Sequence, residues 1–199
     1  MIKRILVAAC LGASVLLSGC AALLVGGATT GAVVANDRRP GEVVLGDERV
    51  EITAGGRLAK AFGDTVHINI TSYNYTVLLT GEVPDAAAKE QAGKIASEVE
   101  RVKGVVNELQ VAGMSSLAAR GNDTYLTGRV KAAFVAAQKF SATHVKVVTE
   151  AGVVYLLGLV TRTEADEATE LTRSIGGVQK VVRVFEYVVA PTAPVKAGS

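Results

Sequence analysis

The sequence predicts an α+β protein built from two tandem copies of one unit, helix–strand–strand–helix–strand, whose helices pack on small mixed sheets. The first indication is an internal repeat in the chain of 199 residues, where Thr76–Val83 aligns with Val153–Val160 at a shift of 77. The second is that apolar residues after each of these segments recur at intervals of three and four, the spacing of a helix face. The third is that only 5% of residues are aromatic. A core of Val, Ala, Leu and Ile suits small sheets covered by helices.

The N-terminus has the layout of a secretory signal peptide. Lys3 and Arg4 precede an apolar run over residues 5–17, and residues 17–20 read Leu-Ser-Gly-Cys. This last segment resembles the lipobox of bacterial lipoproteins. The resemblance implies that residues 1–19 are removed as a signal peptide.

The lipobox also implies that Cys20 carries diacylglycerol and acyl groups, and the sequence predicts no other cofactor. Two or more acyl chains hold a protein stably on a membrane. Ala21 stands where an Asp would be the usual signal for retention in the inner membrane, so the resemblance implies an anchor in the outer membrane, facing the periplasm. An uncleaved membrane helix is the alternative, because residues 5–35 carry no charge.

Residues 20–45 are predicted to be the lipidated N-terminus and a flexible tether, because they are rich in Gly and Ala. No cysteine follows Cys20, which excludes a disulfide, a zinc–thiolate site and a cysteine nucleophile from the folded part. Loss of residues 1–19 takes the formal charge from +2 to zero. A neutral chain argues against nucleic-acid binding, which needs a basic surface.

The first unit is predicted over residues 46–112. It has an opening helix around residues 57–62 and a hairpin that turns at residues 72–75, where Asn74 is expected to have a positive φ. A second helix and a last strand over residues 105–111 follow. The buried face of that second helix is predicted to consist of Ala88, Ala92, Ile95, Val99 and Val102.

The second unit is predicted over residues 122–190, after a linker at 113–121. It opens with a helix over residues 124–137, for which Asn122 or Asp123 is the expected N-cap.

The remainder of the second unit repeats the first. A hairpin turns at residues 150–152, and a last strand over residues 178–189 precedes a C-terminal tail at 191–199. The opening helices align at a shift of 72 and the last strands at 73, so the second helix of the first unit is predicted to be four residues longer. The helix between hairpin and last strand has a predicted buried face of Ala165, Ala168, Leu171 and Ile175.

The order of elements and three short patterns resemble the BON domain. Thr76–Val83 and Val153–Val160 both end in Leu-x-Gly-x-Val, a Gly-Val pair precedes each last strand, and residues 122–124 read Asn-Asp-Thr at the start of the second unit. A lipobox, a tether and two such units are similar to the periplasmic lipoproteins with two BON domains, the DolP type.

This resemblance implies a non-enzymatic protein that binds phospholipid and supports outer-membrane integrity, including at places rich in anionic lipid such as the division site. It also implies that the opening helix of the second unit makes the contact. In that family the aromatic residue after Asn-Asp-Thr is typically Trp, and here it is Tyr125.

A helical wheel of residues 124–137 supports a lipid-facing helix independently of the family. The side expected in the core holds Leu126, Val130, Ala133, Phe134 and Ala137. The opposite side is apolar and flanked by cations, where an ordinary surface helix would be charged. This side, the predicted lipid-binding site, holds Tyr125, Gly128, Arg129, Lys131, Ala132 and Val135. Apolar area bordered by cations is typical of a helix that lies in a membrane interface.

The charges of the two units favour anionic phospholipid as the partner of the second. Residues 46–112 hold 7 basic and 10 acidic side chains, whereas residues 120–199 hold 10 basic and 7 acidic ones. Two alternatives for the helix face are contact with the first unit and an ordinary solvent surface. For the whole protein, the alternative is a lipid-tethered adaptor that presents the helix or an edge strand to an envelope assembly protein.

Nothing else in the sequence predicts chemistry, a metal site or a small-molecule substrate. His67 and His144 occupy one equivalent position of the repeat, and without a second ligand at fixed spacing a structural role is expected for both. Glu164, Glu167 and Glu170 recur every three residues and are predicted to form the solvated face of one helix. The glycine pairs lack the sequence context of a phosphate loop.

Overall fold

The computed structural model describes residues 37–189, which belong to one compact unit of the chain. The predicted signal peptide, Cys20 and most of the predicted tether lie outside the described residues. Among the helices that the structure describes, none combines the length and the hydropathy needed to cross a membrane.

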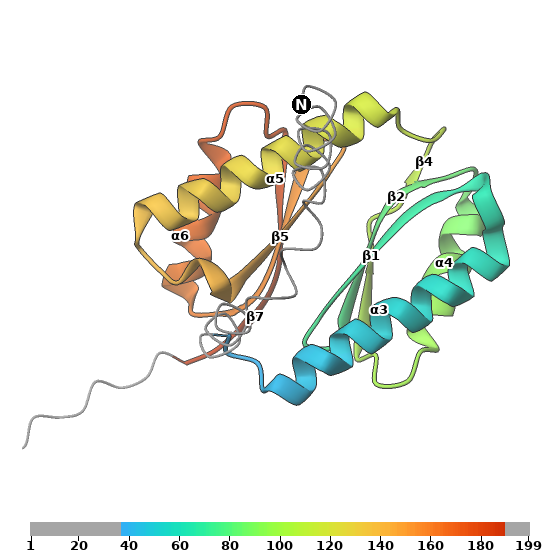
Figure 1. Cartoon of the computed structure of the whole chain (residues 1–199), viewed down its shortest axis with the longest axis horizontal. Helices are drawn as coiled ribbons and strands as arrows, with labels where there is room; N and C mark the ends of the chain where they lie inside the picture. Colours follow the sequence, from blue (N-terminus) through green and yellow to red (C-terminus); the bar gives the residue numbers. More distant parts are fainter. Residues whose placement is uncertain (1–36, 190–199) are drawn as a thin grey trace, which may run out of the picture. The chain divides into compact units, whose positions relative to one another are not determined.

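The first repeat unit has the predicted order of helix, two strands, helix and strand (Figure 1). Strand β2 is central: β1 pairs with it antiparallel, and β3 and β4 pair with it parallel, so the sheet is mixed. The strand predicted over residues 105–111 is present as two short strands, β3 and β4. The elements are α3 (Gly41–Phe62), the 3₁₀ turn η2 (Gly63–Thr65), β1 (His67–Tyr73), β2 (Thr76–Val83), α4 (Ala86–Ser97), β3 (Gly104–Asn107) and β4 (Gln110–Val111).

The second repeat unit has the same order and the same strand directions. Strand β6 is central, with β5 antiparallel on one side and β7 parallel on the other. The α+β class with two tandem αββαβ units is thus confirmed. The elements are α5 (Leu117–Ala137), the 3₁₀ turn η3 (Ala142–His144), β5 (Val145–Glu150), β6 (Val153–Val160), α6 (Arg162–Arg173) and β7 (Lys180–Tyr187).

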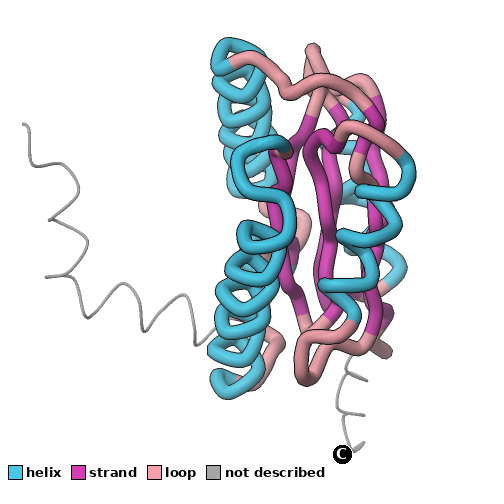
Figure 2. The backbone as a smooth tube through the Cα atoms, turned by 90° about the vertical axis from the view of Figure 1, so that its right-hand side faces the viewer, coloured by secondary structure: helices cyan, strands magenta, loops and turns pink. Residues whose placement is uncertain are grey.

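The two helices of each unit cover one face of its sheet, and Figure 2 shows helices and strands as separate layers. In the first unit the helices contribute small side chains, since Ala54 of α3 and Ala92 and Ala96 of α4 are fully buried against the strands. Alternate residues of β2 point to opposite faces, so Val77 faces the helices and Leu78 faces away from them.

The helix-free faces of the two sheets share a third apolar cluster. Tyr73 and Leu78 of the first unit pack in it with Tyr155 and Leu157 of the second. Burial raises the pKa of the Tyr155 phenol to about 12. The two units therefore dock through their sheets, and the phenol in the interface stays neutral at physiological pH.

Polar contacts surround this interface. Asn69 Nδ2 donates to Glu150 Oε2 at 2.7 Å and Lys146 Nζ to Glu51 Oε1 at 2.9 Å. Each contact joins a strand or helix of one unit to a strand of the other, so the interface is held by polar groups as well as by apolar packing.

A buried carboxylate on the opening helix of each unit closes its hairpin. Asp47 of α3 accepts hydrogen bonds from the backbone N–H groups of Asn74 and Tyr75, at 2.8 and 2.7 Å. Asp123 of α5 accepts from the N–H groups of Ala151 and Gly152, both at 2.9 Å. Both turns have two residues with positive φ, as predicted for Asn74. The expectation that Asn122 or Asp123 is the N-cap of the helix is wrong. Asp123 lies inside the helix, and its carboxylate accepts the hydrogen bonds from the turn at residues 151–152.

Both opening helices begin earlier than predicted. Helix α3 begins at Gly41, inside the predicted tether, and α5 begins at Leu117, inside the predicted linker 113–121. The N-cap of α5 is Ser116, whose side chain accepts a hydrogen bond from Ala119 N. The extra turns place Asp47 and Val50 in the core, and this burial stabilises residues whose glycine-rich sequence favours a tether.

In the α-helices and the last strands, each residue of the first unit corresponds to the residue 76 positions later in the second unit. The predicted shifts of 72 for the opening helices and 73 for the last strands are therefore wrong. Val50, Ala54 and Leu58 occupy the places of Leu126, Val130 and Phe134 in the cores. Helices α4 and α6 have 12 residues each, so the predicted four-residue difference between them is wrong. A slip of four residues is about one helical turn and leaves the buried face unchanged, which is why periodicity does not reveal it.

The prediction that Glu164 lies on a solvated face is also wrong. Its side chain forms a capping box with Thr161. Its carboxylate also makes a bidentate ion pair with Arg38, whose two guanidinium nitrogens donate to Oε2 at 2.7 Å and to Oε1 at 2.9 Å. Burial opposes the charged form, but hydrogen bonds from Arg38 and from the Thr161 N–H outweigh it and lower the pKa of Glu164 to about 2. Glu164 therefore connects the first turn of α6 to the segment that precedes α3, through its ion pair with Arg38.

Candidate functional site

Helix α5 presents two different faces. Leu126, Val130 and Phe134 are buried against the strands of the second unit, as predicted. Because these residues recur at intervals of four, they fix the rotation of the helix about its axis. The opposite face is thereby turned outward.

All six residues of the predicted lipid-binding site lie on that outward face. Tyr125 is 63% exposed and Val135 is 64% exposed, and a Cβ atom on Gly128 would meet no atom within 4 Å. The alternative in which Tyr125 and Val135 cover the first unit is therefore wrong, since the units dock through their sheets. Arg129, Lys131 and Ala132 are exposed beside them.

The two cations of the site have different surroundings. The guanidinium of Arg129 donates to the carbonyl oxygen of Gly176 at 2.8 Å and lies 5.8 Å from the centre of the Tyr125 ring. Arg129 is therefore oriented by the loop before β7, with its charge next to the aromatic ring. By the periodicity of the helix, exposed Lys131 lies on the other side of the apolar residues from Arg129.

The apolar stripe is longer than the sequence predicted. Leu117 is 84% exposed and stands two turns before Tyr125, with Gly121 between them at intervals of four. Residues 117, 121, 125, 128, 132 and 135 thus form one exposed line along α5. Residues 117 and 121 lie outside the predicted helix, which begins at residue 124, although Ser116 is a residue type that commonly caps a helix.

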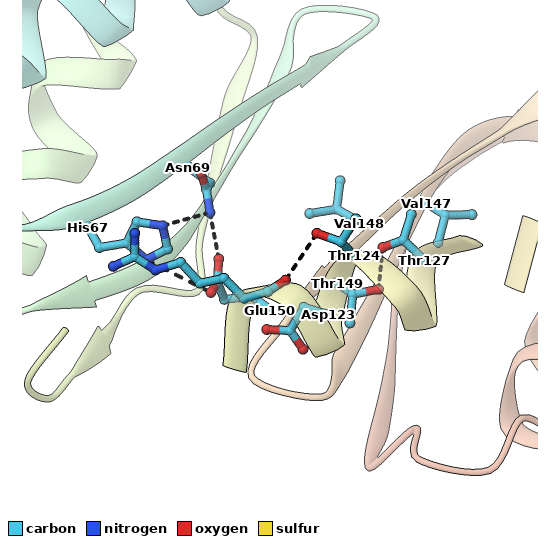
Figure 3. Close-up of a pocket in the computed structure, with 10 residues that line it drawn as sticks. His67, Asn69, Asp123, Thr124, Thr127, Val147, Val148, Thr149 and Glu150 are labelled. Carbon is cyan, nitrogen blue, oxygen red and sulfur yellow. Dashed lines mark hydrogen bonds and ion pairs between the residues drawn. The ribbon is translucent and has the colours of Figure 1, made fainter. Parts of the chain in front are cut away.

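A group of ionisable side chains lies where the two units meet, and His67 and Glu150 of this group are shown in Figure 3. His67 Nδ1 is 2.9 Å from Glu82 Oε2 and 4.0 Å from Glu150 Oε1, and both carboxylates are buried. Burial opposes the charged form of Glu82, but hydrogen bonds from the Ser115 N–H and from His67 outweigh it and hold its pKa below the usual range. An imidazole and two carboxylates are groups that can hold a metal ion.

The other histidine has a different environment. His144 Nδ1 is 3.4 Å from Glu164, whose charge is already matched by Arg38. The two histidines occupy one repeat position, as predicted, but the two carboxylates beside His67 were not predicted. No signal within either repeat places Glu150 there, because it comes from the other unit.

Comparison with protein-family models gives two matches, both to the BON domain, over residues 48–113 and 122–188. Each match covers one αββαβ unit from within its opening helix to the end of its last strand. The chain belongs to the BON-domain family.

The chain is also similar in sequence to three known proteins. The chain is 38% identical to "Outer membrane lipoprotein DolP" of Haemophilus influenzae over 179 residues, which cover 89% of this chain and 93% of that protein. It is 33% identical to "21 kDa hemolysin" of Actinobacillus pleuropneumoniae, over 76% of this chain and 79% of that one. It is also 33% identical to "Osmotically-inducible protein Y" of Escherichia coli, over 57% of this chain and 58% of that protein.

Proposed function

We propose that this protein is a lipid-anchored, non-enzymatic protein of the outer membrane that binds anionic phospholipid through helix α5 of its second BON domain. The exposed apolar stripe of α5, with its flanking cations, is the observation that carries the proposal. The name of the Haemophilus influenzae relative, an outer membrane lipoprotein, supports the location. In this proposal the protein supports outer-membrane integrity, including at the division site.

The chemistry of the stripe matches a lipid interface. Apolar side chains gain free energy by leaving water for the acyl boundary, and a tyrosine ring prefers the headgroup level. Arg129 and Lys131 lie where lipid phosphates would be, and a basic residue near an anionic leaflet contributes about 1 kcal/mol. The excess of basic side chains in residues 120–199 adds a long-range attraction.

Substitution of Tyr125 or Val135 by glutamate is expected to weaken binding to anionic vesicles by about tenfold, which corresponds to 1.4 kcal/mol. The carboxylate has to be desolvated and is repelled by lipid phosphate. The measurement is co-sedimentation of residues 21–199, which retain the compact unit from residue 37, with vesicles of phosphatidylglycerol and phosphatidylethanolamine. Circular dichroism checks the fold of each variant.

Ile52→Glu is the matched control, because Ile52 is an apolar residue, 75% exposed, on the opening helix of the first BON domain. It is expected to leave vesicle binding unchanged.

The double substitution Arg129→Ala and Lys131→Ala is expected to weaken binding to anionic vesicles more than binding to neutral vesicles. High salt is expected to reduce this difference, because it screens the surface charges. If the folded Tyr125→Glu and Val135→Glu variants bind as wild type does, α5 is not the lipid site, and the adaptor for an envelope assembly protein becomes the better proposal.

We also propose that Cys20 is the lipidated first residue of the mature chain. Cys20→Ala in the full chain is expected to abolish incorporation of labelled palmitate and to move the protein from the membrane fraction to the soluble fraction. A Cys10→Ala variant is the control and is expected to be labelled normally, because Cys10 lies within the predicted signal peptide. Normal labelling of the Cys20→Ala variant would contradict the lipid anchor.

A further inference from the structure

We propose that His67, Glu82 and Glu150 form a site for a divalent transition-metal ion of the Zn²⁺ type, which joins the two BON domains. The proposal is independent of lipid binding by α5. Its ligands come from three strands: His67 from β1, Glu82 from β2 and Glu150 from β5. Figure 3 shows His67 and Glu150 approaching each other from the two domains.

The distances fit a metal site after a small movement. The three ligand atoms all lie within 4.8 Å of one another, and His67 Nδ1 is already 2.9 Å from Glu82 and 4.0 Å from Glu150. Zinc binds nitrogen and oxygen at about 2.0 to 2.2 Å, so two ligands of a tetrahedral ion lie roughly 3.3 to 3.6 Å apart. An ion would therefore replace the hydrogen bond between His67 and Glu82, these two side chains would separate slightly, and the Glu150 carboxylate would approach the imidazole.

The charge of the site also favours a cation. Glu82 and Glu150 are both buried, and within residues 37–189 neither forms an ion pair with a lysine or an arginine. Two buried carboxylates that share one imidazole carry more negative charge than the imidazole can balance, and a divalent ion would supply the missing positive charge. The imidazole ligand favours zinc-like ions over Ca²⁺ and Mg²⁺, which prefer oxygen ligands.

Neighbouring side chains hold both carboxylates in place. Asn69 Nδ2 donates to Glu150 Oε2 at 2.7 Å, and Ser115 donates to Glu82 Oε2 through its N–H and its hydroxyl, both at 3.1 Å. Such outer hydrogen bonds orient the ligands of protein metal sites. One carboxylate oxygen of each glutamate is thereby fixed before an ion arrives.

The cluster borders a cavity of about 380 Å³ that His67 and Glu150 line together with Arg120. Three protein ligands leave the fourth position of a tetrahedral ion to water or a small anion. Arg120, which donates to Ser115 Oγ at 3.1 Å, places a positive charge in the same cavity. Its charge opposes a cation, so Arg120→Gln is expected to strengthen metal binding.

The internal repeat provides a matched control. His144 holds the equivalent position in the second domain, but the residue that corresponds to Glu82 is Leu159, and Glu164 there is neutralised by Arg38. His144 therefore lacks the second carboxylate, and His144→Gln is expected to leave metal binding unchanged.

The test is isothermal titration of residues 21–199 with Zn²⁺, together with the melting temperature in Zn²⁺ and in EDTA. One ion per chain is expected, with a higher melting temperature in Zn²⁺ and no response to Ca²⁺ or Mg²⁺ at the same concentration. His67→Gln, which can keep a hydrogen bond to Glu82, and Glu150→Gln are each expected to weaken Zn²⁺ binding by about 100-fold or more. The proposal is overturned if wild type shows neither binding heat nor a rise in melting temperature, or if either folded variant binds Zn²⁺ as wild type does.

Discussion

Asp47→Ala is expected to lower the free energy of unfolding by about 3 to 5 kcal/mol, because it leaves buried donors without an acceptor. Oδ1 of Asp47 accepts from Ser72 Oγ at 2.6 Å and from the N–H of Tyr75 at 2.7 Å. Oδ2 accepts from the N–H of Asn74 and from Arg39, both at 2.8 Å. Each donor left unpaired costs roughly 1 to 3 kcal/mol, although Arg39 keeps Asp37 as a partner. Urea unfolding of residues 21–199 measures the change.

Asp85→Ala is the control within the same domain. Asp85 caps α4, where its exposed side chain accepts a single hydrogen bond from Ala88 N at 2.7 Å. Loss of such a cap costs about 1 kcal/mol. If Asp47→Ala costs no more than Asp85→Ala, the buried carboxylate does not hold the hairpin. Asp47→Asn, which keeps one acceptor oxygen, is expected to fall between the two.

The strands and the second helix of each unit were predictable because their patterns are local. Alternation of apolar residues marks the central strands, and intervals of three and four mark the helices α4 and α6. The positive φ at Asn74 follows from the turn chemistry of asparagine. None of these inferences needs a contact between distant parts of the chain.

The true start of α3 was not predictable from propensity. The segment before residue 57 contains Gly46, Gly55 and Gly56, which favour a flexible chain over a helix. The structure explains one of them by packing, since a side chain on Gly46 would overlap the ring of Tyr75. Tertiary contacts of this kind outweigh the cost of glycine in a helix.

Half of the His67 cluster could have been predicted. A two-residue loop at 74–75 fixes the register of the first hairpin, and this register places His67 directly opposite Glu82. Glu150 could not be added, because it reaches His67 only through docking of the two sheets. The exposed face of α5 was predictable from the helix alone. The buried residues on one side of α5 fix how the helix is rotated about its axis, and they thereby determine which side is exposed.

Gly81→Val is expected to destabilise the first BON domain by about 3 to 5 kcal/mol, the second of the two large effects. Gly81 has a φ of +112°, a region that residues with a side chain rarely adopt. A Cβ atom there would also overlap the carbonyl oxygen of His67 on the paired strand. Strain and the overlap act together because β1 cannot move away without breaking its ladder to β2. Urea unfolding of residues 21–199 measures the loss.

Two further glycines separate the causes of that loss. Gly158 is the equivalent residue of the second domain, where a Cβ atom would overlap the carbonyl oxygen of His144 but φ is not positive. Gly158→Val is therefore expected to cost less, about 1 to 3 kcal/mol. Gly56 lies on an exposed part of α3 with no atom within 4 Å of a Cβ position, so Gly56→Ala is expected to stabilise by about 0.5 to 1 kcal/mol. Equal losses for Gly81→Val and Gly158→Val would mean that the positive φ adds nothing and that close approach of the paired strands accounts for the whole constraint.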